Sequence, residues 1–153
     1  MKEVYGDVIK MAKEGQFDLI VHGANCFNVM GAGVARQIAK EFPGAYEADR
    51  LTTAEDRTKL GSISTYFDEG HKVYIVNAYT QYEMGGERAV SYDAIDDCFK
   101  EIANRYFGLK VGYPAIGAGL GGGQWNIIRE IIDYRLKDMD HALVIYQPQS
   151  ENV

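Results

Sequence analysis

Short apolar runs alternate along the chain with segments whose apolar residues recur at helical spacing. Residues 19–21 are wholly apolar and lead to Gly23, which predicts a strand buried on both faces. Residues 34–42 carry their apolar side chains along one side of a helix, and we expect Pro43 and Gly44 to end it. The same reasoning predicts further strands at 62–67, 73–79, 111–116 and 142–146, and further helices from Ser91 and over 125–136.

Helices between most of these strands indicate how the strands are arranged. A helical crossover returns the chain so that the next strand runs parallel to the previous one. We therefore predict an α/β protein, a three-layer α/β/α sandwich with a central mixed, largely parallel sheet. Ligands of such sheets bind beyond the carboxyl ends of the strands, where loops lead into helices.

Composition adds limits on size and partners. The chain of 153 residues is 46% apolar and 25% charged, and it has no Ser/Gly-rich linker, so we expect a single domain over 1–153 and a monomer. The net charge of −6 lacks the positive field that non-specific nucleic-acid binding needs. A small phosphorylated ligand is still compatible with it, because backbone N–H groups and helix N-termini bind anions.

Cysteine usage and the apolar runs bear on compartment. Cys26 and Cys98 lie far apart and without metal-ligand spacing, which favours a reducing compartment. The first seven residues hold no apolar signal-peptide core, and no apolar run approaches the ~20 residues of a membrane helix. We expect a cytoplasmic protein that needs no metal or cofactor and does not bind a membrane.

Two glycine-rich segments follow predicted strands and lead into helices. The first, 23–34, places Gly31 and Gly33 directly before its helix, so its backbone can approach an anion closely. The second, 117–123, has five glycines in seven residues, at an entropic cost of roughly 0.5–1 kcal/mol each relative to alanine. Wrapping a diphosphate is the use that fits such bare main chain best, although turn geometry alone would also explain the first segment.

Two familiar nucleotide-binding motifs do not account for these segments. Gly117, Gly119 and Gly122 satisfy G-x-G-x-x-G, but that fingerprint opens a fold, and here only one more helix and strand follow. The last strand also ends in Tyr146-Gln147-Pro148, without the acidic residue that would bind a ribose. Neither segment ends in the Gly-Lys-Ser/Thr of a P-loop, so we expect binding or slow chemistry rather than magnesium-dependent nucleotide hydrolysis.

Five segments, in this order and spacing, resemble the macro domain family along nearly the whole chain. They are Gly6-Asp7-Val8, His22-Gly23-Ala24-Asn25, 30–34, 116–121 and Tyr146 at the end of the last strand. The resemblance implies an ADP-ribose site in which Asp7 accepts from the adenine amino group, Asn25 contacts the distal ribose and Tyr146 packs on the adenine. The ligand-binding residues that it implies are Asp7, Val8, Asn25, Met30, Gly31, Ala32, Gly33, Val34, Ile116, Gly117, Ala118, Gly119, Leu120, Gly121 and Tyr146.

Within the family, the sequence is similar to a branch of terminal ADP-ribose glycohydrolases, DNA ADP-ribose hydrolases and ADP-ribose-1″-phosphate phosphatases. It departs from protein-deacylating members, which carry a nucleophilic lysine where Thr80-Gln81 stands and an acid where Gly121 stands. His22 and Asn25 match a His-x-x-Asn pair of the phosphatases, and the resemblance implies them as catalytic residues. The leading hypothesis is therefore a phosphatase of ADP-ribose 1″-phosphate. A hydrolase that removes ADP-ribose from protein or nucleic acid, and a non-catalytic reader, stay open.

Most of these residues also have a purely structural interpretation. His22 has an unperturbed pKa near neutrality and can act as acid or base, but it can also simply hydrogen-bond a neighbouring loop. Asn25 can cap its own loop, and Asp7 can be the N-cap of a helix that begins at Val8. Tyr146 can be ordinary core.

Two further residues are expected to be structural, and one segment stays open. Cys26 is expected to be a packed side chain, because no Lys or Arg nearby would lower the pKa of its thiol. Trp125 is expected to anchor its helix against the sheet. The segment 79–88 can close over the distal ribose or be a mobile surface loop, and the sequence does not choose between these alternatives.

Overall fold

The computed structural model describes residues 1–83, 89–119 and 121–148, and a six-stranded sheet forms its centre. The strands are β1 (Lys2–Gly6), β2 (Leu19–Asn25), β3 (Ile63–Asp68), β4 (Val73–Gln81), β5 (Val111–Tyr113) and β6 (His141–Tyr146). Their order across the sheet is β1-β6-β5-β2-β4-β3. Neighbouring strands are parallel except at β3, which is antiparallel to β4, so the sheet is mixed and largely parallel, as predicted.

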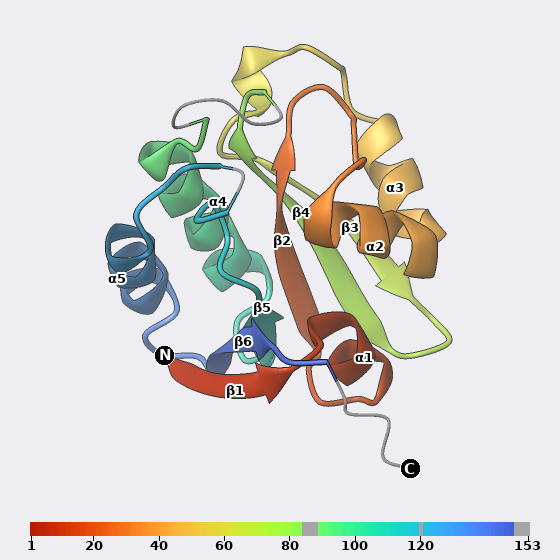
Figure 1. Cartoon of the computed structure of the whole chain (residues 1–153), viewed down its shortest axis with the longest axis vertical. Helices are drawn as coiled ribbons and strands as arrows, with labels where there is room; N and C mark the ends of the chain where they lie inside the picture. Colours follow the sequence, from red (N-terminus) through yellow and green to blue (C-terminus); the bar gives the residue numbers. More distant parts are fainter. Residues whose placement is uncertain (84–88, 120, 149–153) are drawn as a thin grey trace.

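Helices cover both faces of this sheet. They are α1 (Val8–Lys13), α2 (Gly33–Glu41), α3 (Pro43–Arg50), α4 (Tyr92–Arg105) and α5 (Trp125–Arg135), and a short 3-10 helix, η1 (Arg57–Lys59), precedes β3. Helices α1, α2 and α3 lie on one face, and α4 and α5 lie on the other (Figure 1). The predicted three-layer α/β/α sandwich is confirmed.

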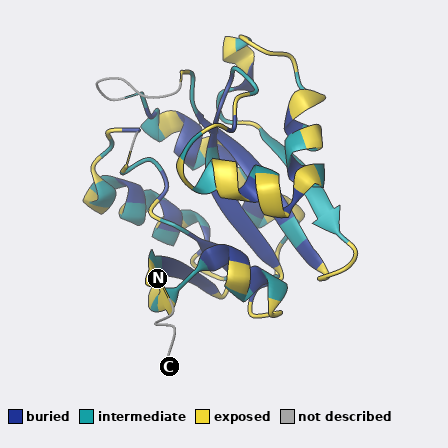
Figure 2. Ribbon diagram, turned by 45° about the vertical axis from the view of Figure 1, so that its right-hand side comes forward, coloured by how far each residue is buried: buried dark blue, intermediate teal, exposed yellow. Residues whose placement is uncertain are grey.

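Successive side chains of the central strands enter two apolar cores, one under each helical layer. In β2, Leu19 and Val21 pack on the α4 and α5 side, whereas Ile20 packs with the core of α1, α2 and α3. All three are almost completely buried, and each such burial stabilises the fold by about 1.5–3 kcal/mol. The central strands are accordingly buried along their length, while the outer faces of the helices are exposed (Figure 2). Burial on both faces explains why this strand is apolar at consecutive positions.

Two predicted helix caps are present. The Oδ1 atom of Asp7 accepts hydrogen bonds from the backbone N–H groups of Ile9 and Lys10 at 2.9 and 3.2 Å, at the start of α1. The hydroxyl of Ser91 accepts from the N–H of Ala94 at 3.1 Å, at the start of α4. Each cap satisfies donors that the first helical turn leaves free, a contribution of about 1 kcal/mol.

The observed elements differ from the predicted ones at several points. Pro43 does follow the end of α2, but it also opens α3 as the first helical residue, where its missing N–H is not needed. Strand β5 ends at Tyr113 rather than at residue 116, because Pro114 cannot donate a hydrogen bond to a neighbouring strand. The sequence pattern missed β1, α3 and η1 altogether.

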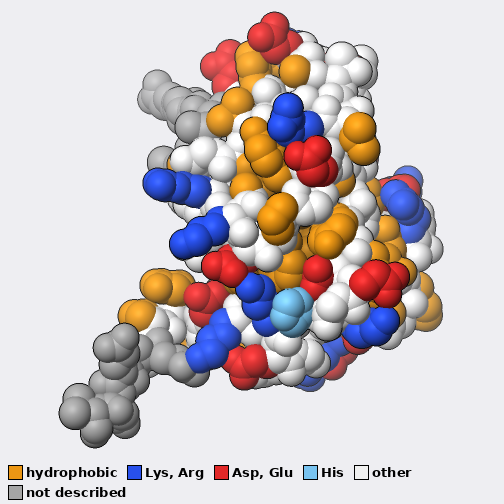
Figure 3. All heavy atoms as spheres, turned by 90° about the vertical axis from the view of Figure 1, so that its right-hand side faces the viewer, with side chains coloured by type: hydrophobic (Ala, Val, Ile, Leu, Met, Phe, Trp, Pro, Cys, Tyr) orange, Lys and Arg blue, Asp and Glu red, His pale blue; other side chains and the backbone are white. Residues whose placement is uncertain are grey.

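The surface carries charges of both signs. Figure 3 views the side of the molecule that lies to the right in Figure 1, and acidic and basic side chains are interspersed there among apolar ones. Charges on the surface also pair, as Lys13 does with Glu41 at 2.6 Å. This side therefore presents no broad field of a single sign. Within the described ranges, no helix is both long enough and apolar enough to cross a bilayer.

Candidate functional site

A cleft of about 330 Å³ opens where β2 and β4 end, between the start of α2 and the turn that follows β5. We call it the main cleft. Three stretches of chain form its walls: the end of β2, the loop into α2, and the glycine-rich segment that precedes α5. Its lining residues are His22, Gly23, Ala24, Asn25, Val29, Gly31, Ala32, Gly33, Val34, Ala35, Gln81, Pro114, Ala115, Ile116, Gly117, Gly119 and Gly121.

A second hollow, of about 250 Å³, adjoins the main cleft. The two share Gly33, Val34 and Pro114 as lining residues, so together they form one extended groove. The adjoining hollow is lined from the end of β1, the start of α1 and the end of β6. Its lining residues are Gly6, Asp7, Val8, Ile9, Gly33, Val34, Gln37, Pro114, Val144 and Tyr146.

The N-terminus of α2 forms the edge that these two spaces share. Gly33 has φ +58°, a left-handed backbone conformation that favours glycine, and it turns the chain from the loop into the helix. Ala32 at the N-cap offers no side-chain acceptor, and the first backbone bond of the helix runs from the N–H of Arg36 to the carbonyl of Ala32. In the part of the chain that the structure describes, the N–H groups at the positions between them have no backbone acceptor, so they can bind an anion, with the positive end of the helix dipole behind them.

The described residues of the glycine-rich segment, 117–119 and 121–123, form the opposite wall, and the chain is folded on itself there. The N–H of Gly123 donates to the carbonyl of Gly117 at 2.7 Å. Gly117 has φ +77°, and a Cβ there would stand 2.8 Å from Val90, so this position needs glycine for the fold itself. Gly119 differs, because a Cβ there would meet no atom within 4 Å. Its bare backbone faces open space, as expected for a surface that a ligand approaches.

His22 lies in the middle of β2, not at its end, and its side chain is 1% exposed. Its Nε2 atom lies 2.6 Å from the Oδ1 of Asn77, the residue opposite it in β4. Because this amide oxygen only accepts, Nε2 carries the proton, and the buried Nδ1 is left without a hydrogen-bond partner. Burial lowers the pKa of His22 to about 4, with the contacts to Asn77 and Gly23 opposing the shift only partly. The imidazole is neutral at pH 7, which removes the expected advantage of a pKa near neutrality.

Asn25 ends β2 and organises the loop that follows. Its Nδ2 donates to the carbonyl of Val29 at 2.8 Å, and its Oδ1 accepts from the N–H of Phe27 at 2.9 Å. The side chain thus makes the loop-capping contacts of the structural interpretation and lines the main cleft as well. Gln81 lies opposite Asn25 in the sheet and also lines the cleft. The sequence pointed to Gln81 only as a departure from the family pattern, not as a lining residue.

The structure gathers most of the predicted site residues along the extended groove, with three exceptions. Met30 is buried in the core beside α1 and α2, and Ala118 lines neither space. Leu120 lies outside the described residues, as do residues 84–88 of the segment 79–88. Tyr146 is 67% exposed, so it is not ordinary core.

Cys26 is packed, as expected, but the reason given for it was wrong. Its side chain is fully buried, and burial raises the pKa of its thiol. Lys59 lies close enough to oppose that rise, and its Nζ is 3.5 Å from the Cys26 carbonyl. A basic residue is therefore near in space although distant in sequence, and burial outweighs it.

The main cleft is uncharged at neutral pH. No Lys, Arg, Asp or Glu is among its described lining residues, and His22 is neutral. In the described part of the chain, no group of three or more His, Cys, Asp or Glu side chains is placed to hold a metal ion. An anion bound here would be held by main-chain N–H groups and the dipole of α2.

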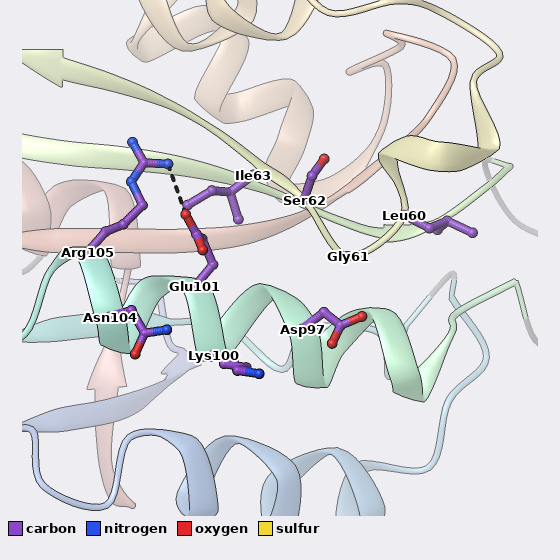
Figure 4. Close-up of a pocket in the computed structure, with 9 residues that line it drawn as sticks. All are labelled: Leu60, Gly61, Ser62, Ile63, Asp97, Lys100, Glu101, Asn104 and Arg105. Atoms are coloured by element: carbon purple, nitrogen blue, oxygen red, sulfur yellow. Dashed lines mark ion pairs between the residues drawn. The ribbon is translucent and has the colours of Figure 1, made fainter.

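A larger hollow, of about 470 Å³, lies between α4 and the segment before β3 (Figure 4). None of the predicted site residues lines it. The charged side chains drawn there come from α4 and have both signs, and Arg105 pairs with Glu101 at 3.6 Å. Gly61 allows the close approach of the two segments, since a Cβ there would stand 2.9 Å from the Cβ of Asp97. Size alone therefore does not make this hollow the better candidate.

Comparison with known proteins assigns the family. Residues 21–132, which include both walls of the main cleft, match the family model described as Macro domain. The chain belongs to the macro domain family. The predicted resemblance is thus confirmed at the level of the family.

Two curated relatives are similar to this macro domain along most of its length. It is 39% identical over 155 residues to the 17.5 kDa protein in the tk-vs intergenic region of Enterobacteria phage T4, with 97% of each chain covered. It is 28% identical over 142 residues to the DNA ADP-ribosyl glycohydrolase of Thermus aquaticus. The match covers 88% of this macro domain but 39% of that longer protein.

Solved structures agree on the fold. A protein of unknown function from Bacteroides thetaiotaomicron superposes with a TM-score of 0.79 at 24% identity, covering 96% of this chain and 99% of that one. Thermosipho africanus DarTG in complex with ADP-ribose superposes with a TM-score of 0.72 at 19% identity, covering 100% of this macro domain and 43% of that chain. At these identities the likeness extends to the fold alone.

Proposed function

We propose that this macro domain binds ADP-ribose along the extended groove. The observation that carries the proposal is a pair of bare backbone segments that face each other across the main cleft: the start of α2, and the turn that carries Gly117, Gly119 and Gly121. The described lining residues of this cleft include no charged side chain. A diphosphate fits this arrangement, because two sets of N–H donors can hold its charge while no carboxylate repels it. The Thermosipho africanus structure, which contains ADP-ribose, supports the same ligand.

The adjoining hollow suits the adenine. Among the described residues, the cap of α1 uses only the Oδ1 atom of Asp7, and its Oδ2 can accept a hydrogen bond from the adenine amino group. The exposed ring of Tyr146 lines the same hollow and offers a face for stacking. The distal ribose then lies toward Asn25 and Gln81, at the other end of the groove.

For the reaction, we propose hydrolysis of ADP-ribose 1″-phosphate. Water attacks the phosphorus, the bond from phosphorus to the 1″ oxygen breaks, and ADP-ribose and inorganic phosphate leave. The N–H groups of the two backbone walls stabilise the negative charge that develops. His22 is buried and neutral, so its role in this proposal is to hold the end of β2 in place through its hydrogen bond to Asn77 rather than to act as a charged acid.

Release of ADP-ribose from a macromolecule is the second candidate, and the name of the Thermus aquaticus relative favours it. A route through an amine adduct has no support in this cleft, since its described lining residues include neither a lysine nor a carboxylate. This absence favours the phosphatase over that form of glycohydrolase.

The test combines binding with product analysis. Calorimetry with ADP-ribose measures binding, and incubation with ADP-ribose 1″-phosphate, ADP-ribosylated DNA and ADP-ribosylated protein is followed for phosphate and ADP-ribose. We expect binding and release of phosphate, and we expect His22→Ala to slow that release. Release of ADP-ribose instead would replace the phosphatase with the hydrolase, and binding without any release would leave a reader. No binding at all would overturn the proposal.

A further inference from the structure

Gln81 and Asn25 bring two amide side chains together where two neighbouring strands end. They are opposite one another in the parallel pairing of β4 with β2, just after an irregularity between Ala24 and Asn25. Both line the main cleft. Their side chains nevertheless differ in what remains free to bind a ligand.

The amide of Asn25 is used at both ends by its own loop, through the carbonyl of Val29 and the N–H of Phe27. Gln81 is used at one end only, because its Nε2 donates to the carbonyl of Glu83 at 2.7 Å. That bond fixes which way the amide points. Across the described part of the chain, its Oε1 receives no hydrogen bond.

The free oxygen of Gln81 lies against the glycine-rich wall. A Cβ added to Gly121 would stand 3.0 Å from this Oε1, so the oxygen and the bare backbone of Gly121 are close neighbours. Both residues line the main cleft. An acceptor is thereby placed at one end of the main cleft, beside two backbone walls that offer N–H donors.

Acceptors and donors select different parts of a ligand. The N–H groups of the α2 start suit the anionic diphosphate, whereas a carbonyl oxygen repels an anion and accepts from a hydroxyl group. We propose that Gln81 is the specificity-determining residue of the groove, and that its Oε1 accepts a hydrogen bond from a hydroxyl of the distal sugar. The inference rests on the proposed binding of ADP-ribose and adds the group that distinguishes this ligand from ADP.

Calorimetry with ADP-ribose and with ADP tests the inference, because ADP lacks the distal sugar. We expect the wild-type protein to bind ADP-ribose more tightly than ADP. Gln81→Leu removes the acceptor at similar size, and we expect it to weaken ADP-ribose by about 2- to 13-fold, the range of one net hydrogen bond, while ADP changes less than about twofold. Unchanged affinity for ADP also reports that the variant is folded.

Gln37→Leu is the matched control, since Gln37 lines the adjoining hollow at the other end of the groove. We expect it to affect both ligands by the same factor, which leaves the preference for ADP-ribose intact. The inference is overturned if Gln81→Leu weakens both ligands equally or weakens neither. If the wild-type protein binds neither ligand, the proposed function itself fails, and the two failures are thus distinguishable.

Discussion

The ammonium nitrogen of Lys59 lies 2.6 Å from the Oδ1 atom of Asn28, in the loop that Asn25 begins. Asn28 has φ +59°, a left-handed conformation that asparagine tolerates better than most residues. Its Nδ2 donates to the carbonyl of Thr52 at 2.8 Å. Lys59 itself is 7% exposed and lies over the ring of Tyr79. A buried cation thus holds the loop beside the main cleft in its unusual backbone conformation.

Replacing Lys59 by methionine tests this support. The variant keeps an unbranched chain but removes the charge that faces Asn28 and compensates the buried carboxylate of Asp49. We expect the free energy of unfolding to fall by about 2 kcal/mol, as for other hydrogen bonds to charged groups. Urea unfolding measures the change. Lys72→Met, at an exposed lysine, is the control and should leave stability nearly unchanged; equal effects at both positions would contradict the role of Lys59.

The fold was largely predictable, because its central elements have strong patterns. Leu19 and Val21 enter one core and Ile20 the other, so continuous apolarity correctly indicated a strand buried on both faces. The pattern of apolar residues failed to predict α3, because Pro43 has two roles. Pro43 ends one helix and begins the next, and a proline is compatible with both.

The lining of the groove was also largely predictable, since glycine-rich segments after strands are visible in any sequence. The charge states were not, because they depend on residues brought together by the fold. Lys59 approaches Cys26 from 33 positions away along the chain. Asn77 pairs with His22 across 55 positions, and the burial that lowers the pKa of this imidazole follows from the sheet rather than from local sequence.

His22 should make stability depend on pH. Its folded pKa of about 4 lies below the ordinary value of 6.5, so the unfolded chain binds a proton that the folded chain excludes. The contribution is therefore complete above pH 6.5 and is lost progressively as the pH falls toward 4, to a total of roughly 3 kcal/mol. Urea unfolding at pH 7 and pH 5 measures the slope.

A variant isolates this slope from other groups. His141 also has a lowered pKa because of burial, so the wild-type slope contains both histidines. We expect His22→Gln to have a shallower loss of stability between pH 7 and pH 5 than the wild-type protein. An unchanged slope in His22→Gln would show that His22 is not the group responsible.

Asp7 combines a structural role with the proposed binding role, and two substitutions separate them. Serine can still cap α1, so Asp7→Ser should keep stability within about 0.5 kcal/mol, whereas Asp7→Ala should lose about 1 kcal/mol. Both remove the carboxylate, so both should weaken ADP-ribose by roughly 10-fold or more. Urea unfolding measures the change in stability, and calorimetry measures the change in affinity for ADP-ribose. Ser91→Ala removes the cap of α4 and should lower stability without changing affinity; normal affinity in Asp7→Ser would remove Asp7 from the binding site.

Two glycines of the segment 117–123 should respond in opposite ways. A Cβ at Gly123 would stand 2.7 Å from Val90, so Gly123→Ala forces the turn to move and should cost about 1–3 kcal/mol of stability.

A side chain at Gly119 would meet no protein atom within 4 Å and would instead occupy the space proposed for the diphosphate. Gly119→Val should therefore unfold at nearly the wild-type urea concentration. It should bind ADP-ribose at least about 10-fold more weakly, because losing a few N–H contacts to an anion costs more than about 1.4 kcal/mol of binding free energy. Gly70→Ala, in an exposed turn where the nearest atom would be 3.8 Å away, should change neither property. If Gly119→Val bound ADP-ribose normally, the diphosphate would have to lie elsewhere, because the added side chain and the ligand cannot occupy the same space.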